Sequence, residues 1–460
     1  MDMIEILVKH VWRVGFENLP PKVVLFTKKS IIDTLGVMIA GSSVKGCELL
    51  VDYIREWGGH PESTIAVFGT KVPCALAAQA NGAMARAMEL DDVSDAYPLH
   101  VTASVLPACM AVAERAGNVN GKQLITAVAL GQDLAVRMAL AMKLTPVVSG
   151  RYNLSQVFCY AALAAKLLGL TEEQALNAAG IGYHQMVGDI QALTDGVMTA
   201  YIQQGTRAKS AIEAALMAQK GITGTKDVLQ GQFGFFHAYE PDPNLEDLTS
   251  GLGMELRGPE LSVKLHSTCR FTHESIDLAQ SFLSDGLDPD DIAYVKVRCA
   301  DQPYKLVGQP VELKQKPETH VDAKFSIPYT TAAAFLRGDV FIEEVDEETI
   351  KDPKILDLAQ RITPVVDPTC QSDIVLGRTV MEVTTRDGRT LRKEIQFPKG
   401  NPRNPASMDD CIAKFRKCVI YSKRPFPDGQ LDHIVKLVKN LEQVEDASQL
   451  VRSLIPQRLT

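Results

Sequence analysis

Several side chains that can exchange protons lie within residues 89–100 of this chain. Glu89, Asp91 and Asp92 are followed by Asp95 and then by His100. They separate an Ala-rich segment from a second small, apolar one, and we expect both segments to be buried. Because burying unpaired carboxylates is costly, this acidic turn needs an explanation. It is either a proton-handling site or an exposed loop whose acids cap the neighbouring helices.

Three cationic segments elsewhere in the chain are candidates for binding anions. In the first, Arg207 and Lys209 come directly after Gly205, in the expected first turn of a helix over residues 206–220. Cations in a first turn oppose the helix dipole unless an anion is bound nearby, and the alternative is a solvated basic turn.

The second cationic segment, residues 263–273, lies where the character of the chain changes, and small-molecule clefts often form at domain boundaries. Its ionisable side chains are Lys264, His266, Cys269, Arg270 and His273. An interdomain salt-bridge cluster is the alternative interpretation. The third segment, residues 324–329, offers a lysine and the phenol of Tyr329, and it can equally be the plain end of a strand.

An acidic turn with a histidine and three cationic segments fit one particular chemistry. Abstraction of a proton α to a carboxylate needs a base, and cations must hold the substrate carboxylates and the enediolate-like charge that develops. The sequence contains no G-x-S-x-G, H-E-x-x-H or Walker pattern and no histidines at metal-ligand spacing. Hydrolase, NTPase and metal-enzyme interpretations therefore find no motif to support them.

Length and composition set the remaining bounds. A chain of 460 residues predicts two or three domains, and 46% hydrophobic with 23% charged residues is typical of a soluble globular protein. The net charge of -8 and the pI near 5.7 argue against a nucleic-acid binder. The nine scattered cysteines form no C-x-x-C pair, which predicts reduced, buried thiols.

Targeting signals are not apparent in the sequence. The first fourteen residues carry Asp2 and Glu5 and are typical of an amphipathic helix, not of a signal peptide. No stretch of about 18 uncharged apolar residues occurs, so we expect no membrane span. A cytoplasmic location is the expectation.

The elements that must position these residues are mainly helical over the first 250 residues. The spacing of apolar residues predicts helices over residues 4–18, 21–41, 45–57, 73–88, 105–116, 121–142, 155–168, 171–184 and 206–220. Several look apolar on most faces, as in a large bundle. Gly180 and Gly182 follow an Ala-rich helix without the spacing of a nucleotide loop, which favours close helix packing.

The pattern changes near Gly258. Alternation predicts strands over residues 293–300, 379–385 and 390–397, with a hairpin turn over residues 386–389, and helices over residues 330–337 and 347–362. Amphipathic helices return at residues 408–421 and 430–454. The predicted fold is therefore mainly α, with a helical domain from residues 1–259 and 397–460 and an inserted α+β domain at residues 260–396.

These segments resemble the MmgE/PrpD family over nearly the whole chain. The family typically shows a helix ending in A-L-D-F-D-D, then a loop and His-Pro; here residues 87–92 read A-M-E-L-D-D, and His100 precedes Val101. Its K-P-Y-P-C-C-R-x-T-H is similar to residues 264–273, and its K-F-S-x-x-Y matches residues 324–329. A closing D-G and P-K-G-x-P-x-N-P pattern matches residues 387–388 and 398–405.

The resemblance implies a helical domain built from both termini, an α+β lid domain and a homodimer. It also implies chemistry without a cofactor or metal on small di- or tricarboxylates. Members include 2-methylcitrate dehydratase, cis-aconitate decarboxylase and iminodisuccinate epimerase. A catalytic trio and a carboxylate-binding set on the lid follow from the matched motifs. They are Asp91, His100 and Lys209 for catalysis, and Lys264, Cys269 and Arg270 for binding, with Tyr329 near the site.

The chain also departs from the family pattern. Glu89 replaces the first Asp of D-F-D, while Asn153 and Gln203 stand where many members carry histidine. We expect all three to contact substrate. A lyase, by dehydration or decarboxylation, is the leading hypothesis. Losing two proton donors raises an epimerase as the second hypothesis, and a catalytically inactive binding protein is the third.

Overall fold

The computed structural model describes residues 1–372 and 376–457 and divides the chain into two compact units. Unit 1 comprises Met1–Ser94, Pro98–Leu261 and Ser407–Thr460, and unit 2 comprises Asp95–Tyr97 and Ser262–Ala406. The sequence placed the inserted domain at residues 260–396. The three residues at the tip of the acidic turn were expected in the helical domain, and the structure instead assigns them to unit 2.

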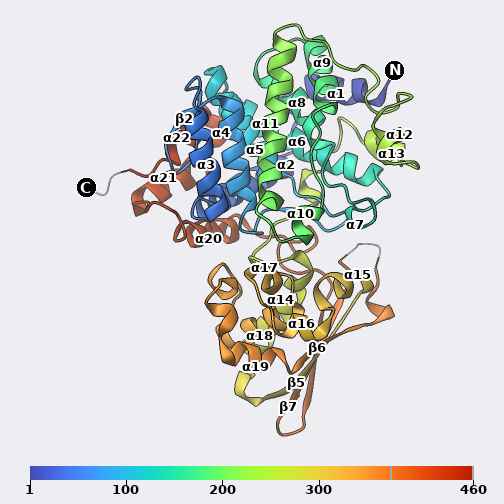
Figure 1. The fold of residues 1–460 in the computed structure, drawn as a ribbon, viewed down its shortest axis with the longest axis vertical. Helices are drawn as coiled ribbons and strands as arrows, with labels where there is room; N and C mark the ends of the chain where they lie inside the picture. Colours follow the sequence, from blue (N-terminus) through green and yellow to red (C-terminus); the bar gives the residue numbers. More distant parts are fainter. Residues whose placement is uncertain (373–375, 458–460) are drawn as a thin grey trace. The chain divides into compact units, whose positions relative to one another are not determined.

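Unit 1 is built mainly from helices, in agreement with the apolar spacing of its sequence (Figure 1). Before the insertion they are α1 (Met3–Arg13), α2 (Pro21–Gly41), α3 (Lys45–Trp57), α4 (Cys74–Arg86), α5 (Thr102–Ala116), α6 (Gly121–Ala141), α7 (Pro146–Ser149), α8 (Gln156–Leu167), α9 (Glu172–Tyr183), α10 (Gln191–Thr194), α11 (Thr199–Gln219), α12 (Phe235–Tyr239) and α13 (Leu245–Thr249). After it they are α20 (Met408–Val419), α21 (Asp428–Lys439) and α22 (Ser448–Ser453). The short strands are β1 (Ser63–Thr64), β2 (Lys71–Val72) and β3 (Val93–Ser94).

Helix α11 corrects one of the sequence predictions. It begins at Thr199, so Gly205 lies inside the helix and not before its first turn. A Cβ on Gly205 would come 1.9 Å from the carbonyl oxygen of Gln79 in α4, and one on Gly82 would come 2.7 Å from the Cα of Gly205. Gly205 therefore permits the close crossing of α4 and α11. The expected anion site at a helix N-terminus is wrong.

Helix α9 is capped at its start and packs closely near its end. Thr171 caps α9, because its hydroxyl accepts from the backbone N–H of Gln174 while the Gln174 side chain accepts from Thr171. The predicted close helix packing is confirmed at Gly182, where a Cβ would come 3.0 Å from the Cα of Phe158 in α8. The predicted helix over residues 430–454 is wrong in part, because it is interrupted between α21 and α22.

Helix α6 is the one helix in the described part of the chain that is long and apolar enough to cross a membrane. In the structure, 94% of its most apolar window is buried. It packs against α2, α5 and α8, so its apolar surface is covered by other helices of unit 1. A core helix of a large helical domain passes the same test of length and composition.

Unit 2 contains a four-stranded sheet with the order β6-β5-β7-β8. Its strands are β5 (Ile292–Cys299), β6 (Ile362–Val366), β7 (Thr379–Thr385) and β8 (Thr390–Ile395). β5 runs antiparallel to β7 and parallel to β6, with Val295 opposite Ile362 and Cys299 opposite Val366. The buried residues alternate along β5, so one face of the sheet lies on the unit's apolar core.

Helices cover that core and include α14 (His273–Ser284), α15 (Asp301–Pro303), α16 (Val311–Gln315), α17 (His320–Lys324), α18 (Ile327–Arg337) and α19 (Pro353–Ala359). β4 (Leu261–Ser262) stands at the boundary of the units. The helix predicted over residues 347–362 is wrong at both ends, because α19 begins at Pro353 and stops at Ala359, and Ile362 begins β6. β6 is an edge strand, where a proline such as Pro364 is tolerated. A proline inside a run argues against a strand, so the local sequence did not predict β6.

Candidate active site

The acidic turn forms a small hairpin between α4 and α5. Val93 forms an isolated bridge with His100, and the Ser94 N–H donates to the Leu99 carbonyl oxygen at 3.0 Å. This pairing brings both ends of the turn together. Asp91 and His100, nine residues apart in sequence, therefore lie side by side in unit 1.

A buried carboxylate–imidazole pair is the centre of this site. Nδ1 of His100 lies 2.8 Å from Oδ2 of Asp91, and Nε2 lies 3.9 Å from Oε1 of Glu89. The guanidinium of Arg86, in the last turn of α4, donates to Glu89 and lies 3.5 Å from Oδ1 of Asp91. Asp91 is fully buried and His100 is 7% exposed. The acids of this part of the turn are therefore paired, as buried carboxylates must be.

The electrostatics assign a protonation state to the pair. Burial alone would raise the pKa of Asp91, but the charges of His100 and Arg86 outweigh it and lower that pKa. Burial, together with the charge of Arg86, lowers the pKa of His100. At neutral pH Asp91 is thus ionised and His100 neutral. Since a carboxylate only accepts, Nδ1 carries the proton and Nε2 presents a lone pair, the arrangement of a general base.

Two residues of the site have strained backbones. Glu89 has φ of 54° and Asn153 has φ of 56°, in the left-handed region that non-glycine residues rarely occupy. Among the residues that the structure describes, Val67 is the third non-glycine residue with positive φ. Such strain costs free energy and persists where the surroundings impose it, often at functional sites.

Three amide side chains converge on the backbone carbonyl oxygen of His100. Gln156 donates to it, Gln204 donates at 3.2 Å and Asn153 at 3.4 Å. The edge of the Tyr152 ring also faces the imidazole, with 6.1 Å between ring centroids. Helices α8 and α11 and the segment before α8 therefore all hold His100 in place.

The amides of Asn153 and Gln203, at the two positions where the family pattern led us to expect histidine, have structural partners. Asn153 donates to the His100 carbonyl oxygen, so it contacts the site without supplying an acid or a base. Gln203 exchanges two hydrogen bonds of 3.0 Å with the backbone of Asp189 and accepts from Arg207. Neither Asn153 nor Gln203 therefore supplies a second imidazole beside that of His100.

Lys209 is not brought to this cluster. Its ammonium lies 3.4 Å from Glu213, one turn along the same helix. Arg207, two positions earlier, points to the opposite side of α11, because each helical residue turns by about 100°. Arg207 connects to Gln204, and Arg86 contacts Asp91, so the cations associated with His100 are guanidiniums.

Asp92 caps a neighbouring helix, which was the structural interpretation of the acidic turn as opposed to the proton-handling one. Its Oδ1 accepts from the backbone N–H of Thr102 at 2.9 Å, at the start of α5, and its Oδ2 accepts from the Thr102 hydroxyl. Burial, with Asp91 and Asp33 nearby, raises the pKa of Asp92 to about 7 despite these bonds. One turn thus contains a catalytic candidate and a cap side by side.

We expect Asp92→Asn to change how stability depends on pH. A carboxyl whose folded pKa is raised stabilises the fold fully below its unfolded pKa near 4 and loses this contribution as pH rises through about 7. The variant should match the wild type near pH 4 and exceed it at pH 8 by about 1–3 kcal/mol in free energy of unfolding. Urea unfolding at both pH values measures this, and an unchanged difference would contradict the assignment.

The tip of the acidic turn has its partners within unit 2. Asp95 accepts two hydrogen bonds from Arg270, with Nε to Oδ1 at 2.9 Å and Nη2 to Oδ2 at 3.0 Å. It also accepts from Ser262 at 2.6 Å and from Asn401 at 2.7 Å. Although burial opposes it, the charge of Arg270 lowers the pKa of Asp95. Arg270, expected to bind substrate, therefore has a bidentate protein carboxylate on its guanidinium.

The other residues expected to bind substrate also lie in unit 2. Lys264 and Cys269 are buried, and the Cys269 N–H donates to the Lys324 carbonyl oxygen at 2.9 Å. Tyr329 is fully buried in the apolar core, and its hydroxyl donates to the Glu344 carbonyl oxygen at 2.7 Å. Burial raises the pKa of Tyr329. Its phenol is a core group with a backbone partner.

Sequence reasoning missed three residues that contact the central pair. Arg86 stands three residues before Glu89, and this spacing of opposite charges was a usable signal, whereas its contact with Asp91 follows from no helical spacing. Gln156 and Gln204 lie at distant positions of apolar helices, where a glutamine carries no motif. Only the fold shows that they meet at His100.

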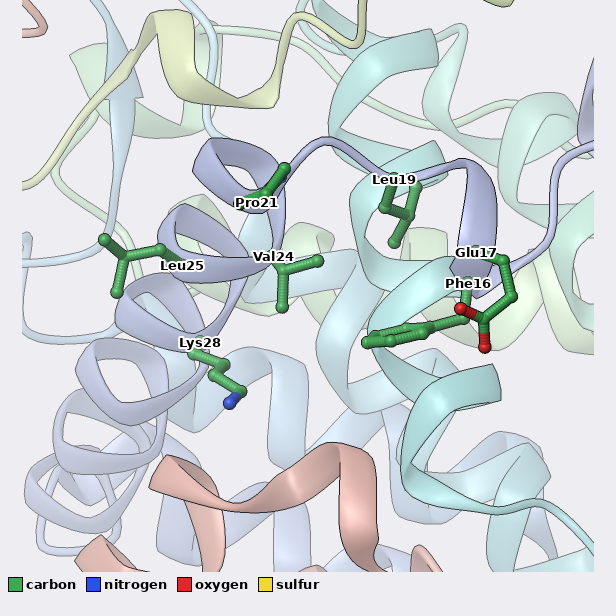
Figure 2. A pocket seen from close by; sticks show the side chains of 7 residues that line it. All are labelled: Phe16, Glu17, Leu19, Pro21, Val24, Leu25 and Lys28. Carbon is green, nitrogen blue, oxygen red and sulfur yellow. The ribbon is translucent and has the colours of Figure 1, made fainter.

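One cavity lies elsewhere in unit 1 (Figure 2). It is bounded by the start of α2 and the segment before it, and none of the candidate residues lines it. Its lining residues are Phe16, Glu17, Leu19, Pro21, Val24, Leu25 and Lys28. Within the described residues, no group of three or more His, Cys, Asp and Glu side chains is arranged to hold a metal ion.

Comparisons with known proteins match both parts of the chain. The MmgE/PrpD N-terminal domain matches residues 5–248, and the MmgE/PrpD C-terminal domain matches residues 266–440. Cis-aconitate decarboxylase-like protein oryM of Aspergillus oryzae is 27% identical over 94% of this chain and 93% of its own. Human cis-aconitate decarboxylase is 27% identical over 97% and 92%. The 2-methylcitrate dehydratase of Cupriavidus necator is 23% identical over 61% and 59%.

Proposed function

Because the chain belongs to the MmgE/PrpD family, we propose that it is a lyase acting on a small di- or tricarboxylic acid without a cofactor. The observation that carries this proposal is the buried pair of Asp91 and His100, joined at 2.8 Å with a neutral imidazole facing Glu89. The relatives with decarboxylase and dehydratase names support lyase chemistry.

In a dehydration, Nε2 of neutral His100 would take the proton α to a carboxylate. The electron pair left on carbon forms the double bond as the β-hydroxyl leaves and takes up the proton from Nε2, so one water is released and His100 returns to its neutral form. Asp91 stabilises the imidazolium that forms and keeps the proton on Nδ1. The lowered pKa of His100 suits this role, because a base must be unprotonated before it reacts.

In a decarboxylation, the same imidazole would give a proton and not take one. The bond to the departing carboxylate breaks, its electron pair shifts through the neighbouring double bond, and protonated His100 donates to the far carbon. One proton is consumed for each CO2 released. This reaction should slow as pH rises through the lowered pKa of His100, whereas proton abstraction should persist.

Cations for the substrate carboxylates are part of the same proposal. Lys264 and Arg270 of unit 2 keep this role on the strength of the matched motif, and so does Lys209, whose ammonium is paired with Glu213. Arg270 would share its guanidinium with Asp95. An enolate-like charge next to a carboxylate needs such positive groups, since electrostatic stabilisation is usually the largest contribution to catalysis.

An epimerase of the iminodisuccinate type is the second candidate, favoured by one observation. Asn153 and Gln203 supply no acid or base, and their amides already hold His100 and the backbone of Asp189. A reaction that removes and returns a proton at one carbon needs no departing group to be protonated. The third candidate, an inactive binding protein, is disfavoured by the paired and buried Asp91 and His100.

Substrate assays in deuterated water separate these candidates. We expect the purified chain to release CO2 from cis-aconitate or an alkene from 2-methylcitrate, followed by coupled CO2 detection and ultraviolet absorbance. Deuterium exchange into iminodisuccinate without CO2 or alkene from either acid would replace the lyase with the epimerase. Absence of turnover and exchange with all three acids would favour the binding protein.

A further inference from the structure

Arg207 is a buried guanidinium whose hydrogen bonds go to four neutral oxygen atoms. Nε donates to the Val187 carbonyl at 3.0 Å, and Nη2 donates to the Tyr152 carbonyl at 3.1 Å and to Oε1 of Gln203 at 3.0 Å. Nη1 donates to Oε1 of Gln204. The side chain is fully buried, and burial lowers its pKa to about 10. Burying a guanidinium that has no carboxylate partner costs free energy. A specific task for Arg207 would explain why the fold bears that cost.

The partners of Arg207 determine which way the Gln204 amide faces. A guanidinium has only donors, so it binds the oxygen end of an amide side chain. With Oε1 of Gln204 held by Arg207, its NH2 group points to the carbonyl oxygen of His100, 3.2 Å away. The reversed amide would set two acceptor oxygens against each other. Arg207 thus selects the orientation that binds His100.

The segment around Gly188 is shaped for this guanidinium. A Cβ on Gly188 would come 2.0 Å from the Tyr152 carbonyl oxygen and 2.5 Å from Nη2 of Arg207, and its φ of 151° also favours glycine. The Tyr152 N–H donates back to the Gly188 carbonyl oxygen at 3.3 Å. Arg207 therefore joins α11, the residues before α8 and the residues after α9, and the first two of these segments contact His100 directly.

We propose that Arg207 and Gln204 are positioning residues for His100, with the guanidinium presenting the Gln204 NH2 group to the His100 carbonyl. The inference rests on the proposed function only in that His100 is the group positioned for catalysis. Asn153 and Gln156 complete the set of donors to the same oxygen. The backbone of His100 is thereby held where its Nδ1 meets Asp91.

A purely structural role for Arg207 is the competing explanation, and Gln204→Glu separates the two. The glutamate keeps an oxygen for Arg207 and strengthens that bond by charge. Its other oxygen faces the His100 carbonyl and cannot donate. If Arg207 only stabilised the fold, this variant would remain stable and active. A positioning role predicts an unchanged KM with kcat of the folded protein lowered about 100-fold, the effect of a displacement near 1 Å, beyond any fall in melting temperature caused by the two facing oxygens.

Arg207→Lys is the companion variant, because one ammonium cannot reach four acceptors on different segments. It should lower kcat and the melting temperature together. Arg137→Lys is the matched control, since Arg137 is equally buried in unit 1 but bonds Asp133 and the carbonyls of Leu248, Ser250 and Glu255. It should lower the melting temperature while leaving kcat of the folded protein unchanged.

A readout independent of turnover is the downfield proton resonance of His100 Nδ1–H bonded to Asp91, assigned by its loss in Asp91→Asn. We expect Gln204→Glu and Arg207→Lys to shift or abolish it and Arg137→Lys to retain it. If the resonance changes in a chain that converts none of the tested acids, the positioning stands and the lyase proposal falls. If Gln204→Glu keeps both the resonance and wild-type kcat, the positioning is overturned.

Discussion

Asp91→Asn is expected to lower kcat by about 10³–10⁴-fold, the loss that follows when the carboxylate orienting a catalytic imidazole becomes an amide. The NH2 group of asparagine would face Nδ1 of His100, which must then accept. The proton moves to Nε2, so the nitrogen facing Glu89 no longer has a lone pair. Steady-state kinetics with the preferred acid measures the loss.

The neighbouring Asp92→Asn provides the control for Asp91→Asn. It makes the same chemical change one residue away. The Asp92 carboxylate hydrogen-bonds to Thr102 at the start of α5 and not to His100. Its kcat at neutral pH should stay close to that of the wild type. Equal losses in both variants would show that the turn as a whole, and not the carboxylate bonded to His100, supports activity.

Lys414→Met is expected to cost about 3–5 kcal/mol of stability, because it removes the ammonium that lies against the buried carboxylate of Asp33. The Lys414 ammonium lies 2.6 Å from Oδ1 of Asp33 and donates to the Leu90 carbonyl oxygen at 2.7 Å. Both side chains are buried, and Leu90 stands between Glu89 and Asp91. The variant should therefore lose activity as well as stability. Urea unfolding and kcat measure the two effects.

The double variant Asp33→Leu/Lys414→Met tests the cause of that loss. Removing both charges leaves no unpaired ion, so most of the stability should return, as it does when buried ion pairs are replaced by apolar residues. The bond to the Leu90 carbonyl stays broken in both variants, so kcat should remain low. A double variant as unstable as the single one would mean that packing, and not charge, sets the cost.

The amino-acid sequence determined the elements and the central pair. Apolar spacing located most helices of unit 1, because each buries a stripe defined by its own residues. Alternation found β5, β7 and β8 but missed β6, whose strand character comes from pairing with β5 far away in the chain. The acidic turn stood out because five ionisable residues lie close together in sequence, and the resemblance to the MmgE/PrpD family then singled out Asp91 and His100 within it.

Only the tertiary structure decided how the acids of that turn are used. Glu89 and Asp91 join His100 and Arg86, Asp92 caps α5, and Asp95 binds Arg270 within unit 2. The sequence pattern is the same for all four, since each is a carboxylate between two buried segments. Their roles differ because the partner of each comes from a different element.

The amides around His100 show the same limit. Gly205 was taken for the start of a helix, whereas its missing side chain lets α11 cross α4 closely and so brings Gln204 and Arg207 to His100. Such contacts join residues about a hundred positions apart through neutral groups that form no motif. The sequence therefore specified which residues could transfer a proton, and the packing of the helices specified which groups hold them in place.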